Sequence, residues 1–274
     1  MSKRTLISIL TLMMAAVLMW GMLAAAMTAD EIFDRMDDEA DLLAEGSMVS
    51  TIRFDNTYGD GTTASNLFGS IGKPNFSLIY FIEPADVQGT IFLTHETEDE
   101  GAENRLWLYL PILGVPKELV SEEERGGSFA GSSLSYEDLG DDDRRNDYDA
   151  ILLGEEEFVV GDLARTVYKI ESTAKAGADV DTVRTVLWID TEFFIMLRME
   201  GYNDLGNIDT TMQVLALGEF EGRLTAEALL AENVTDESST TVTILDQHRP
   251  EAEIADDVFA PENLTAFDPA VWGF

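Results

Sequence analysis

The sequence predicts a mainly β protein of the α+β class, built on an antiparallel sheet. Short runs of β-branched, aromatic and aliphatic residues fill most of the chain beyond residue 46. Turn signals such as YGDG at 58–61, GKP at 72–74 and NDLG at 203–206 separate many of these runs, as is typical of an antiparallel meander. Neither a linker rich in proline or serine nor an internal repeat divides the chain, so we predict one domain over residues 27–274.

The first residues predict an export signal. Lys3 and Arg4 precede an apolar run over 6–27, which ends in three alanines before the first acidic residues. This order is typical of a signal peptide, which we place at residues 1–26, and an uncleaved membrane anchor is the alternative. The chain contains no cysteine, which excludes disulfides and a lipid-modified cysteine.

Two helices and a series of strands are predicted beyond the signal. The first helix begins at a capping box of Thr28 and Glu31 and ends before Gly46, and its apolar face carries Ile32, Met36, Ala40 and Leu43. A second helix is predicted at 225–233 with Thr225 as its cap, and a one-turn helix near Pro261. Strands are predicted at 47–57, 62–71, 75–83, 89–95, 105–110, 115–120, 148–153, 156–160, 164–172, 182–190, 193–201, 208–217 and 240–246.

Several predicted strands are apolar on both faces. The runs 76–82, 91–93, 106–110 and 193–199 show this pattern, whereas 164–172 alternates between polar and apolar residues. A strand of an antiparallel sheet that is apolar on both faces must be covered on each side, and two helices supply little cover. This excess of apolar sheet indicates either a single strongly curved sheet around an apolar cavity or a β-sandwich core.

The charge composition restricts the partners. The formal net charge is −36, and acidic residues are spread along the whole chain, while 45% of all residues are hydrophobic. Such a surface repels nucleic acid, which we exclude as a partner, and indicates a folded protein adapted to high salt. A calcium loop counted from Asp141 places Arg145 and Leu152 where ligands are required, so that motif is excluded.

The stretch GGSFAGSSLSYEDL at 126–139 narrowly misses two catalytic motifs. A P-loop requires lysine where Ser132 stands, and a nucleophile elbow requires a second glycine where Ala130 stands. A triad of Ser128, an acidic residue and His248 is possible in chain order, but the surrounding pattern does not favour it. We expect instead an irregular segment at the mouth of the fold, anchored by Phe129 and Leu134, in which Ser135 and Asp138 cap a helical turn.

Several stretches together match one bacterial family in order. LWLYLP at 106–111, GSFAGS at 127–132 and SYEDL at 135–139 are followed by VLWID at 186–190, YNDLG at 202–206 and VFAPENL at 258–264. These stretches resemble the outer-membrane lipoprotein-sorting family, the LolA-like proteins, whose pattern runs WLYLP and then GSFMGSDFSYEDL. The chain departs from that pattern at Ala130, Ser133 and Leu134. It also has few of the basic residues that the family carries between these two motifs.

The resemblance implies an incomplete, strongly curved antiparallel barrel with capping helices around an apolar cavity. It implies non-enzymatic, periplasmic carriage of lipids or lipoprotein acyl chains toward the outer membrane, often beside an RND-type exporter. The alternative is an accessory module that docks on such an exporter without its own ligand. We expect a monomer with neither cofactor nor metal site. The expected cavity residues, for which core packing is the alternative, are Phe76, Tyr80, Phe92, Trp107, Tyr109, Phe129, Trp188 and Phe194.

Overall fold

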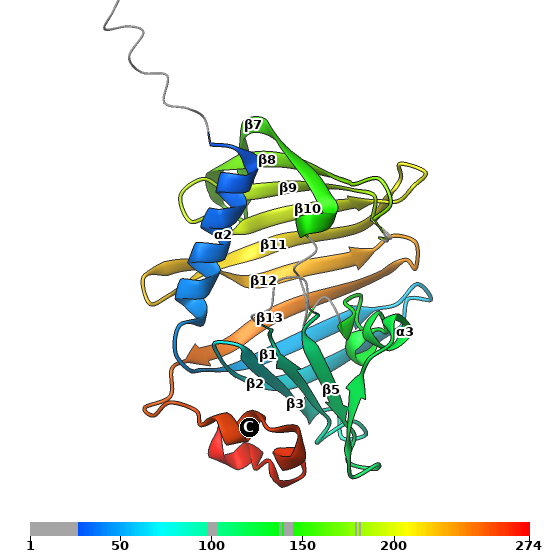
Figure 1. Ribbon diagram of the computed structural model, residues 1–274, viewed down its shortest axis with the longest axis vertical. Coiled ribbons are helices and arrows are strands. Elements are labelled where there is room, and N and C mark those ends of the chain that lie inside the picture. The colour runs from blue at the N-terminus through cyan, green and yellow to red at the C-terminus, as the bar shows by residue number, and fades with distance from the viewer. Residues whose placement is uncertain (1–26, 98–102, 137–138, 140–144, 179, 181) are drawn as a thin grey trace, which may run out of the picture.

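One antiparallel sheet of 13 strands forms most of the described protein, and it is strongly curved (Figure 1). The computed structural model describes residues 27–97, 103–136, 139, 145–178, 180 and 182–274. The predicted signal peptide at residues 1–26 lies outside this part of the chain. Within it, no helix combines the length and apolarity needed to cross a membrane. The single curved sheet agrees with the first of the two architectures that the strand pattern left open.

The elements follow the predicted order with two exceptions. The helices are α2 (Ala29–Ala44) and α3 (Glu122–Arg125), and short 3₁₀ turns lie at Phe129–Gly131, Arg145–Asp147, Asp256–Phe259, Pro261–Ala266 and Pro269–Val271. The strands are β1 (Met48–Thr57), β2 (Thr63–Lys73), β3 (Phe76–Glu83), β4 (Ile91–His95), β5 (Arg105–Tyr109), β6 (Pro116–Leu119), β7 (Tyr148–Val160), β8 (Leu163–Ala174), β9 (Arg184–Asp190), β10 (Met196–Tyr202), β11 (Ile208–Phe220), β12 (Arg223–Asn233) and β13 (Ser238–His248).

Two meanders join side by side to make the sheet. Strands β1 to β6 are neighbours in chain order, β7 to β13 are neighbours in chain order, and β1 pairs with β13. The edges are therefore β6 and β7, and the sheet does not close. The connection from β6 to β7 crosses from one edge to the other. It carries the segment GGSFAGSSLSY, residues 126–136, which we call the plug.

The prediction of a helix at 225–233 is wrong, because these residues form β12. Its alanines and leucines favour a helix in isolation, but the segment lies between β11 and β13 and bonds to both. Leu229, for example, pairs with Val214 on one side and Val242 on the other. Two complete ladders and the packing of these side chains outweigh a weak local preference. The two strands predicted at 148–153 and 156–160 are likewise one strand, β7, which a bulge between Leu152 and Gly154 interrupts.

Helix α2 begins at the predicted capping box. The Thr28 hydroxyl accepts a hydrogen bond from the Glu31 backbone N–H at 3.2 Å, and the Glu31 carboxylate accepts one from the Thr28 N–H at 2.7 Å. The helix lies across the face of strands β7 to β13 (Figure 1). Ile32 is fully buried there, whereas Ala40, which we predicted on the same face, is exposed. Only the first half of α2 therefore packs closely on the sheet.

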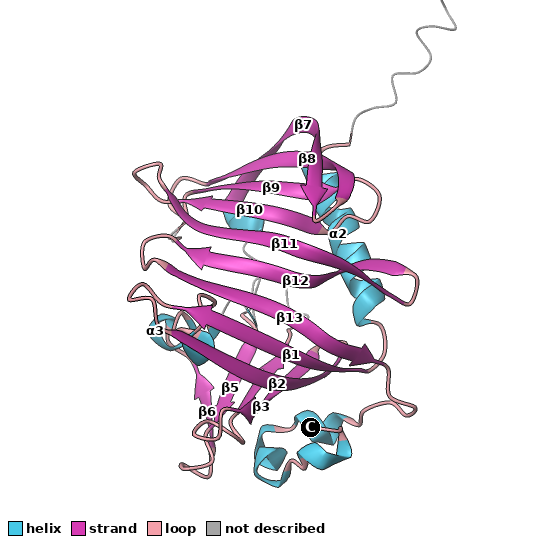
Figure 2. Ribbon diagram, turned by 180° about the vertical axis from the view of Figure 1, so that it is seen from behind, coloured by secondary structure: helices cyan, strands magenta, loops and turns pink. Residues whose placement is uncertain are grey.

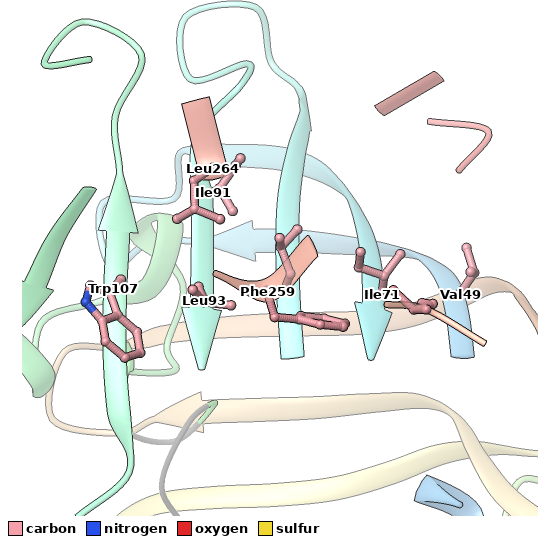
Figure 3. Close-up of a cluster of buried hydrophobic side chains, with 9 residues drawn as sticks. Val49, Ile71, Ile91, Leu93, Trp107, Phe259 and Leu264 are labelled. Carbon is pink, nitrogen blue, oxygen red and sulfur yellow. The ribbon is translucent and has the colours of Figure 1, made fainter. Parts of the chain in front are cut away.

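Both faces of strands β2 to β5 are buried, which explains their doubly apolar sequences. Phe68, Phe81 and Phe92 face the plug. On the opposite face, Ile71, Leu78, Leu93 and Trp107 pack against Phe259 and Leu264 of the C-terminal segment, residues 249–274 (Figure 3). The predicted need for cover on each side is confirmed. Irregular segments supply this cover, so it was not visible in the helical pattern.

In the half of the sheet formed by β7 to β13, the outer face is covered by the edge strand β7. In Figure 2 the end of β7 crosses over the strands beside it, on the side away from α2. Val160 of β7 is buried there against Val167, Val186 and Trp188. The Trp188 indole N–H donates to the Glu156 carboxylate, also on β7. The hairpin of β7 and β8 thus closes a second core on the outside of the sheet.

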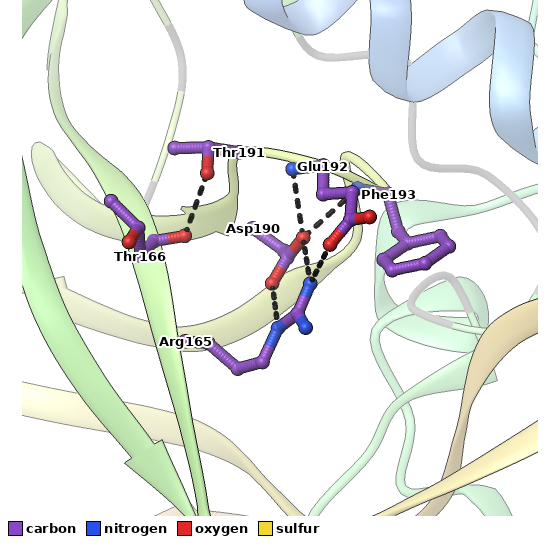
Figure 4. Close-up of polar contacts among 6 residues, drawn as sticks. All are labelled: Arg165, Thr166, Asp190, Thr191, Glu192 and Phe193. Atoms are coloured by element: carbon purple, nitrogen blue, oxygen red, sulfur yellow. Dashed lines mark hydrogen bonds and ion pairs between the residues drawn. The ribbon is translucent and has the colours of Figure 1, made fainter.

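A buried ion pair fixes the turn between β9 and β10 (Figure 4). The Arg165 guanidinium donates two hydrogen bonds to the fully buried Asp190 carboxylate, at 2.6 and 3.0 Å. The same carboxylate accepts from the backbone N–H groups of Glu192 and Phe193, each at 2.9 Å. Burial alone would raise the pKa of Asp190, but these hydrogen bonds outweigh it and lower the pKa. Because of this turn, β10 begins at Met196 and not at residue 193 as predicted.

Candidate functional site

A cavity of about 880 Å³ lies between the concave face of the sheet, helix α2 and the plug. Its walls come from both meanders, so residues from nearly the whole chain meet there. The lining comprises Asp30, Phe33, Met36 and Asp37 of α2; Ile52, Phe54, Phe68 and Ile79 of β1 to β3; Gly126, Phe129, Leu134, Ser135, Leu139 and Arg145 of the β6–β7 connection; and Tyr148, Ala150, Ser172, Val180, Thr182, Thr185, Leu187, Met196, Met199, Gly201, Thr210, Met212, Leu229 and Val242 of β7 to β13 and their loops. This volume is within the range of small-molecule binding pockets.

The lining is mostly apolar and contains four methionines. Met36 lies on the helix, and Met196, Met199 and Met212 lie on β10 and β11. Met199 pairs directly with Met212 and with Leu187, so these three side chains form a continuous apolar row across the sheet. Methionine side chains are unbranched and adjust to irregular shapes. The cavity can therefore accommodate flexible apolar ligands of more than one shape.

The plug is irregular, as predicted, and packs into the concave face. Ala130 and Gly131 both adopt positive φ, at 51° and 72°, which turns the chain back sharply. The Phe129 ring is fully buried among four phenylalanines and Tyr136, with centroid distances of 5.3 to 5.9 Å. Burial also raises the pKa of Tyr136. The Ser133 N–H donates to the Thr240 hydroxyl at 2.8 Å, which ties the plug to β13. Asp138, predicted to cap a helical turn, lies outside the described residues.

Charged groups lie at the α2 side of the cavity. Arg145 donates to the Asp37 carboxylate at 2.9 Å, the Asp34 carboxylate at 2.7 Å and the Asp30 carbonyl at 2.9 Å. Its guanidinium also lies 5.3 Å from the centre of the Phe33 ring. Arg145 therefore joins the beginning of β7 to the first half of α2. Because two carboxylates already pair with it, this arginine does not present an uncompensated positive charge to the cavity.

The predicted cavity residues fall into five places. Phe129 lines the cavity. Phe92 faces the plug, where it packs on Phe129 and Tyr136 beneath the lining. Phe76, Tyr80, Trp107 and Tyr109 lie on the opposite face of the sheet and pack against the C-terminal segment. Trp188 belongs to the outer core under β7, and Phe194 lies in the β9–β10 turn, where it stacks on Tyr168 and under the Arg35 guanidinium. The structure therefore brings only Phe129 of the eight to the cavity wall.

On two strands, the residue that lines the cavity is the immediate neighbour of a residue that we predicted there. On β3, Ile79 lines the cavity while its neighbours Leu78 and Tyr80 face the C-terminal segment. On β9, Leu187 lines the cavity while Trp188 faces outward. Neighbouring side chains of a strand point to opposite faces. The alternation was visible in the sequence, but the bulky aromatic residues gave no indication of which face is concave.

The catalytic alternatives gain no support from local contacts. The Ser128 hydroxyl donates to the Ser132 carbonyl of its own turn at 2.6 Å, and His248 pairs with Asp246 two residues away on β13. Among the described residues, no group of three histidine, cysteine or carboxylate side chains is arranged to hold a metal ion. Apart from the paired charges around Arg145 at the α2 side, the cavity offers an apolar wall with a few neutral hydroxyl groups.

Comparisons with known proteins identify the family and the fold. A family model described as an uncharacterized protein family matches residues 74–266, well over half of the chain. A comparison with curated proteins gave no match. The structure resembles a DUF1329 family protein from Desulfovibrio piger, with a TM-score of 0.73 and 23% identity over 86% of this chain and 98% of that one.

Two further solved structures also cover 86% of this chain each. One is an outer membrane lipoprotein-sorting protein domain from Vibrio parahaemolyticus, with a TM-score of 0.70, 22% identity and 97% of that chain covered. The other is a LolA superfamily protein from Nitrosomonas europaea, with a TM-score of 0.62, 18% identity and 98% of that chain covered. The resemblance seen in the sequence motifs is confirmed at the level of the fold. The match over residues 74–266 shows that the chain belongs to this family of uncharacterized proteins, and its curved, open sheet has the LolA-like fold.

Proposed function

We propose that the protein is a non-enzymatic, periplasmic carrier that encloses the acyl chains of lipids or lipoproteins and moves them toward the outer membrane. The observation that carries this proposal is the 880 Å³ cavity, whose wall is mostly aliphatic, aromatic and methionine side chains. The solved structure from Vibrio parahaemolyticus, which is named for lipoprotein sorting, has the same fold and supports the same class of function.

The energetics suit reversible carriage. Removing a methylene group from water gains about 0.8 kcal/mol, so ten enclosed methylenes supply about 8 kcal/mol before the cost of ordering the chain. After that cost, the remaining affinity is enough to hold a chain in transit and weak enough to release it. The wall methionines can adjust to chains of different length without a change in the sheet.

A bulky substitution in the wall tests the proposal. Delipidated protein is titrated with a fluorescent fatty-acid probe, and natural lipids then compete for the probe. We expect Met212→Trp to weaken probe binding at least tenfold, because the indole fills space beside Met199. Leu215→Trp is the matched control, since Leu215 lies three residues along the same strand and is 40% exposed. The carrier proposal fails if the unmodified protein binds no probe and purifies without any lipid detectable by mass spectrometry.

A second candidate function is supported by an exposed apolar loop. The connection between β5 and β6 projects Ile112, Leu113 and Val115 into solvent, and Ile112 is 92% exposed. Residues 106–116 carry no charge in a chain with net charge −36. Exposed apolar groups of this kind mark sites of interaction with a partner. They favour the alternative of an accessory module that docks on a membrane exporter of the RND type.

One variant and its control distinguish the carrier function from the docking function. Docking predicts that Ile112→Asp abolishes co-purification of a membrane partner and leaves probe binding unchanged. Carriage without docking predicts that the same variant has no effect on co-purification. Thr62→Asp, in the β1–β2 hairpin loop, is the control for added charge at an exposed site.

A further inference from the structure

A row of small hydroxyl side chains crosses one part of the otherwise apolar cavity. Ser172 pairs with Thr185, Thr185 pairs with Gly201, and Gly201 pairs with Thr210, so four neighbouring strands contribute one position each. All four residues belong to the cavity wall, as does Thr182, which lies in the loop before β9. Directly opposed side chains on adjacent strands are about 5 Å apart at Cβ, so these hydroxyls form one patch.

Gly201 is the centre of this hydroxyl patch. A Cβ atom at this position would clash with the Thr210 hydroxyl, and it would lie 3.3 Å from the Thr182 methyl and 3.7 Å from the Thr182 hydroxyl. The space that a side chain would fill is therefore taken by two threonines that converge over the glycine. Only glycine permits this arrangement, because any other residue would displace the Thr210 hydroxyl.

The hydroxyls of the patch have no partner among the described residues. No hydrogen bond within that part of the chain involves the side-chain oxygen of Ser172, Thr182, Thr185 or Thr210. Ser172 is 6% exposed and lines the cavity, so what remains accessible of its side chain opens on the cavity. Alanine or valine would fill these positions without the cost of leaving a polar group unpaired in an apolar site. The patch is therefore suited to a ligand that supplies hydrogen-bond partners.

The neighbouring residues restrict the chemistry of that ligand. The next row on the same face is the apolar row of Leu187, Met199 and Met212, two residues along each strand and thus roughly 7 Å away. A group bound at the patch is therefore directly adjacent to an acyl chain. Asp30, Asp37 and Arg145 also line the cavity, and Arg145 already pairs with the Asp34 and Asp37 carboxylates, so the charge there does not favour an anionic group of a ligand. Hydroxyl donors suit an uncharged acceptor such as a carbonyl oxygen.

We infer that the hydroxyl patch of Ser172, Thr182, Thr185 and Thr210 binds the carbonyl oxygens of acyl esters, so that the cavity selects ester-linked glycerolipid over an equally apolar chain. This inference rests on the proposed carrier function and names the ligand class for the same cavity. The ester can belong to a free glycerolipid or to the diacylglyceryl group of a lipoprotein, and both present the same carbonyls.

A pair of matched lipids tests the inference. Dioleoylglycerol carries two ester carbonyls, and its dialkyl ether counterpart has the same chains without them. Each competes with the fluorescent fatty-acid probe for the unmodified protein. Two hydrogen bonds of ordinary net strength correspond to about tenfold in Kd, so we expect the ester to bind about tenfold more tightly than the ether.

Removal of the hydroxyls should abolish this preference. In Thr185→Val/Thr210→Val, we expect ester binding to fall to the level of the ether while ether binding is unchanged or tighter. Thr211→Val is the matched control, because Thr211 is the next residue on β11 and its hydroxyl donates to Glu232. A diacylated lipopeptide in the same competition shows whether the lipoprotein form of the ester is accepted as well as the free lipid.

The outcomes separate the inference from the function on which it rests. Equal binding of ester and ether to the unmodified protein overturns the patch and leaves the carrier intact. Failure of both lipids to displace the probe overturns the carrier and the patch together. The ligand-free double variant should also unfold at the same temperature or higher, because no internal hydrogen bond is lost. A clear drop in its unfolding temperature would instead assign the hydroxyls a structural role and overturn the inference.

Discussion

Phe129→Ala removes the ring on which the plug is anchored, and it offers the most direct test of how the cavity is built. The ring lies 5.3 Å from the centre of Phe81, 5.4 Å from Phe68 and 5.7 Å from Phe92. It has no exposure to solvent. The same side chain also lines the cavity. Its loss therefore affects the stability of the fold and the shape of the site together.

The expected cost follows from transfer and cavity terms. Phenylalanine-to-alanine changes in cores cost about 3–5 kcal/mol, and each aromatic pair adds up to about 1 kcal/mol beyond buried area. Because Phe129 borders the cavity, the vacated volume joins an existing space and exposes the neighbouring rings to it. We therefore expect a loss near the lower bound, about 3 kcal/mol. For a domain of this size, that loss lowers Tm by roughly 6–12 °C.

Urea unfolding followed by tryptophan fluorescence measures this loss. The midpoint should fall with no change in the slope m, since both states keep their overall compactness. Phe129→Leu is the control, because it keeps an apolar group of nearly the same volume and should cost less than half as much. A loss below about 1 kcal/mol for Phe129→Ala would refute the reasoning, since it would mean that the plug is a surface loop without a role in the core.

Two further predictions concern the β9–β10 turn and the C-terminal segment. Asp190→Asn removes the buried carboxylate and leaves the Arg165 guanidinium paired with the more exposed Glu192 carboxylate, so it should cost about 2–3 kcal/mol at pH 7. Because the folded pKa of Asp190 is lowered below its unfolded value near 3.9, the stabilisation is complete above that value. The difference between unmodified protein and variant should then shrink as the pH falls below about 4, and a gap that is constant in thermal melts from pH 7 to 3 would contradict this. In Gly69→Ala the new methyl group would overlap the Phe274 ring, so we expect carboxypeptidase to digest the C-terminal segment faster than in the unmodified protein. Gly72→Ala is the control, because the nearest atom there is 3.4 Å from the new Cβ. Equal digestion of the two variants would show that Phe274 does not hold that segment.

Local signals in the sequence were enough to place most elements. The capping box of Thr28 and Glu31 marks the first residue of α2, because the bonds that define it join residues three apart. Most of the strands were found from β-rich runs bounded by turn residues. Residues 225–233 were missed because alanine and leucine favour a helix locally, and only pairing with β11 and β13 decides otherwise.

The candidate site was less accessible to prediction. Phe129 was found because its glycine-rich surroundings mark an irregular segment, and irregular segments were expected at the mouth. Trp188 and Tyr80 were selected for size, yet Leu187 and Ile79 beside them line the cavity. A strand sequence shows that two faces exist but carries no sign of which one is concave, because both faces here are apolar.

The sequence by itself therefore determined the class of fold, the positions of most strands along the chain, the cap of α2 and, through its motifs, the family resemblance. Only the tertiary structure decided which face of each strand lines the cavity, what covers the other face, and that the hydroxyls of Ser172, Thr185 and Thr210 meet in one row. The physical reason is the range of the interactions. Caps and turns act over three or four residues, whereas the cover of β2 to β5 on the face away from the plug comes from distant residues of the C-terminal segment, such as Phe259 against Phe76.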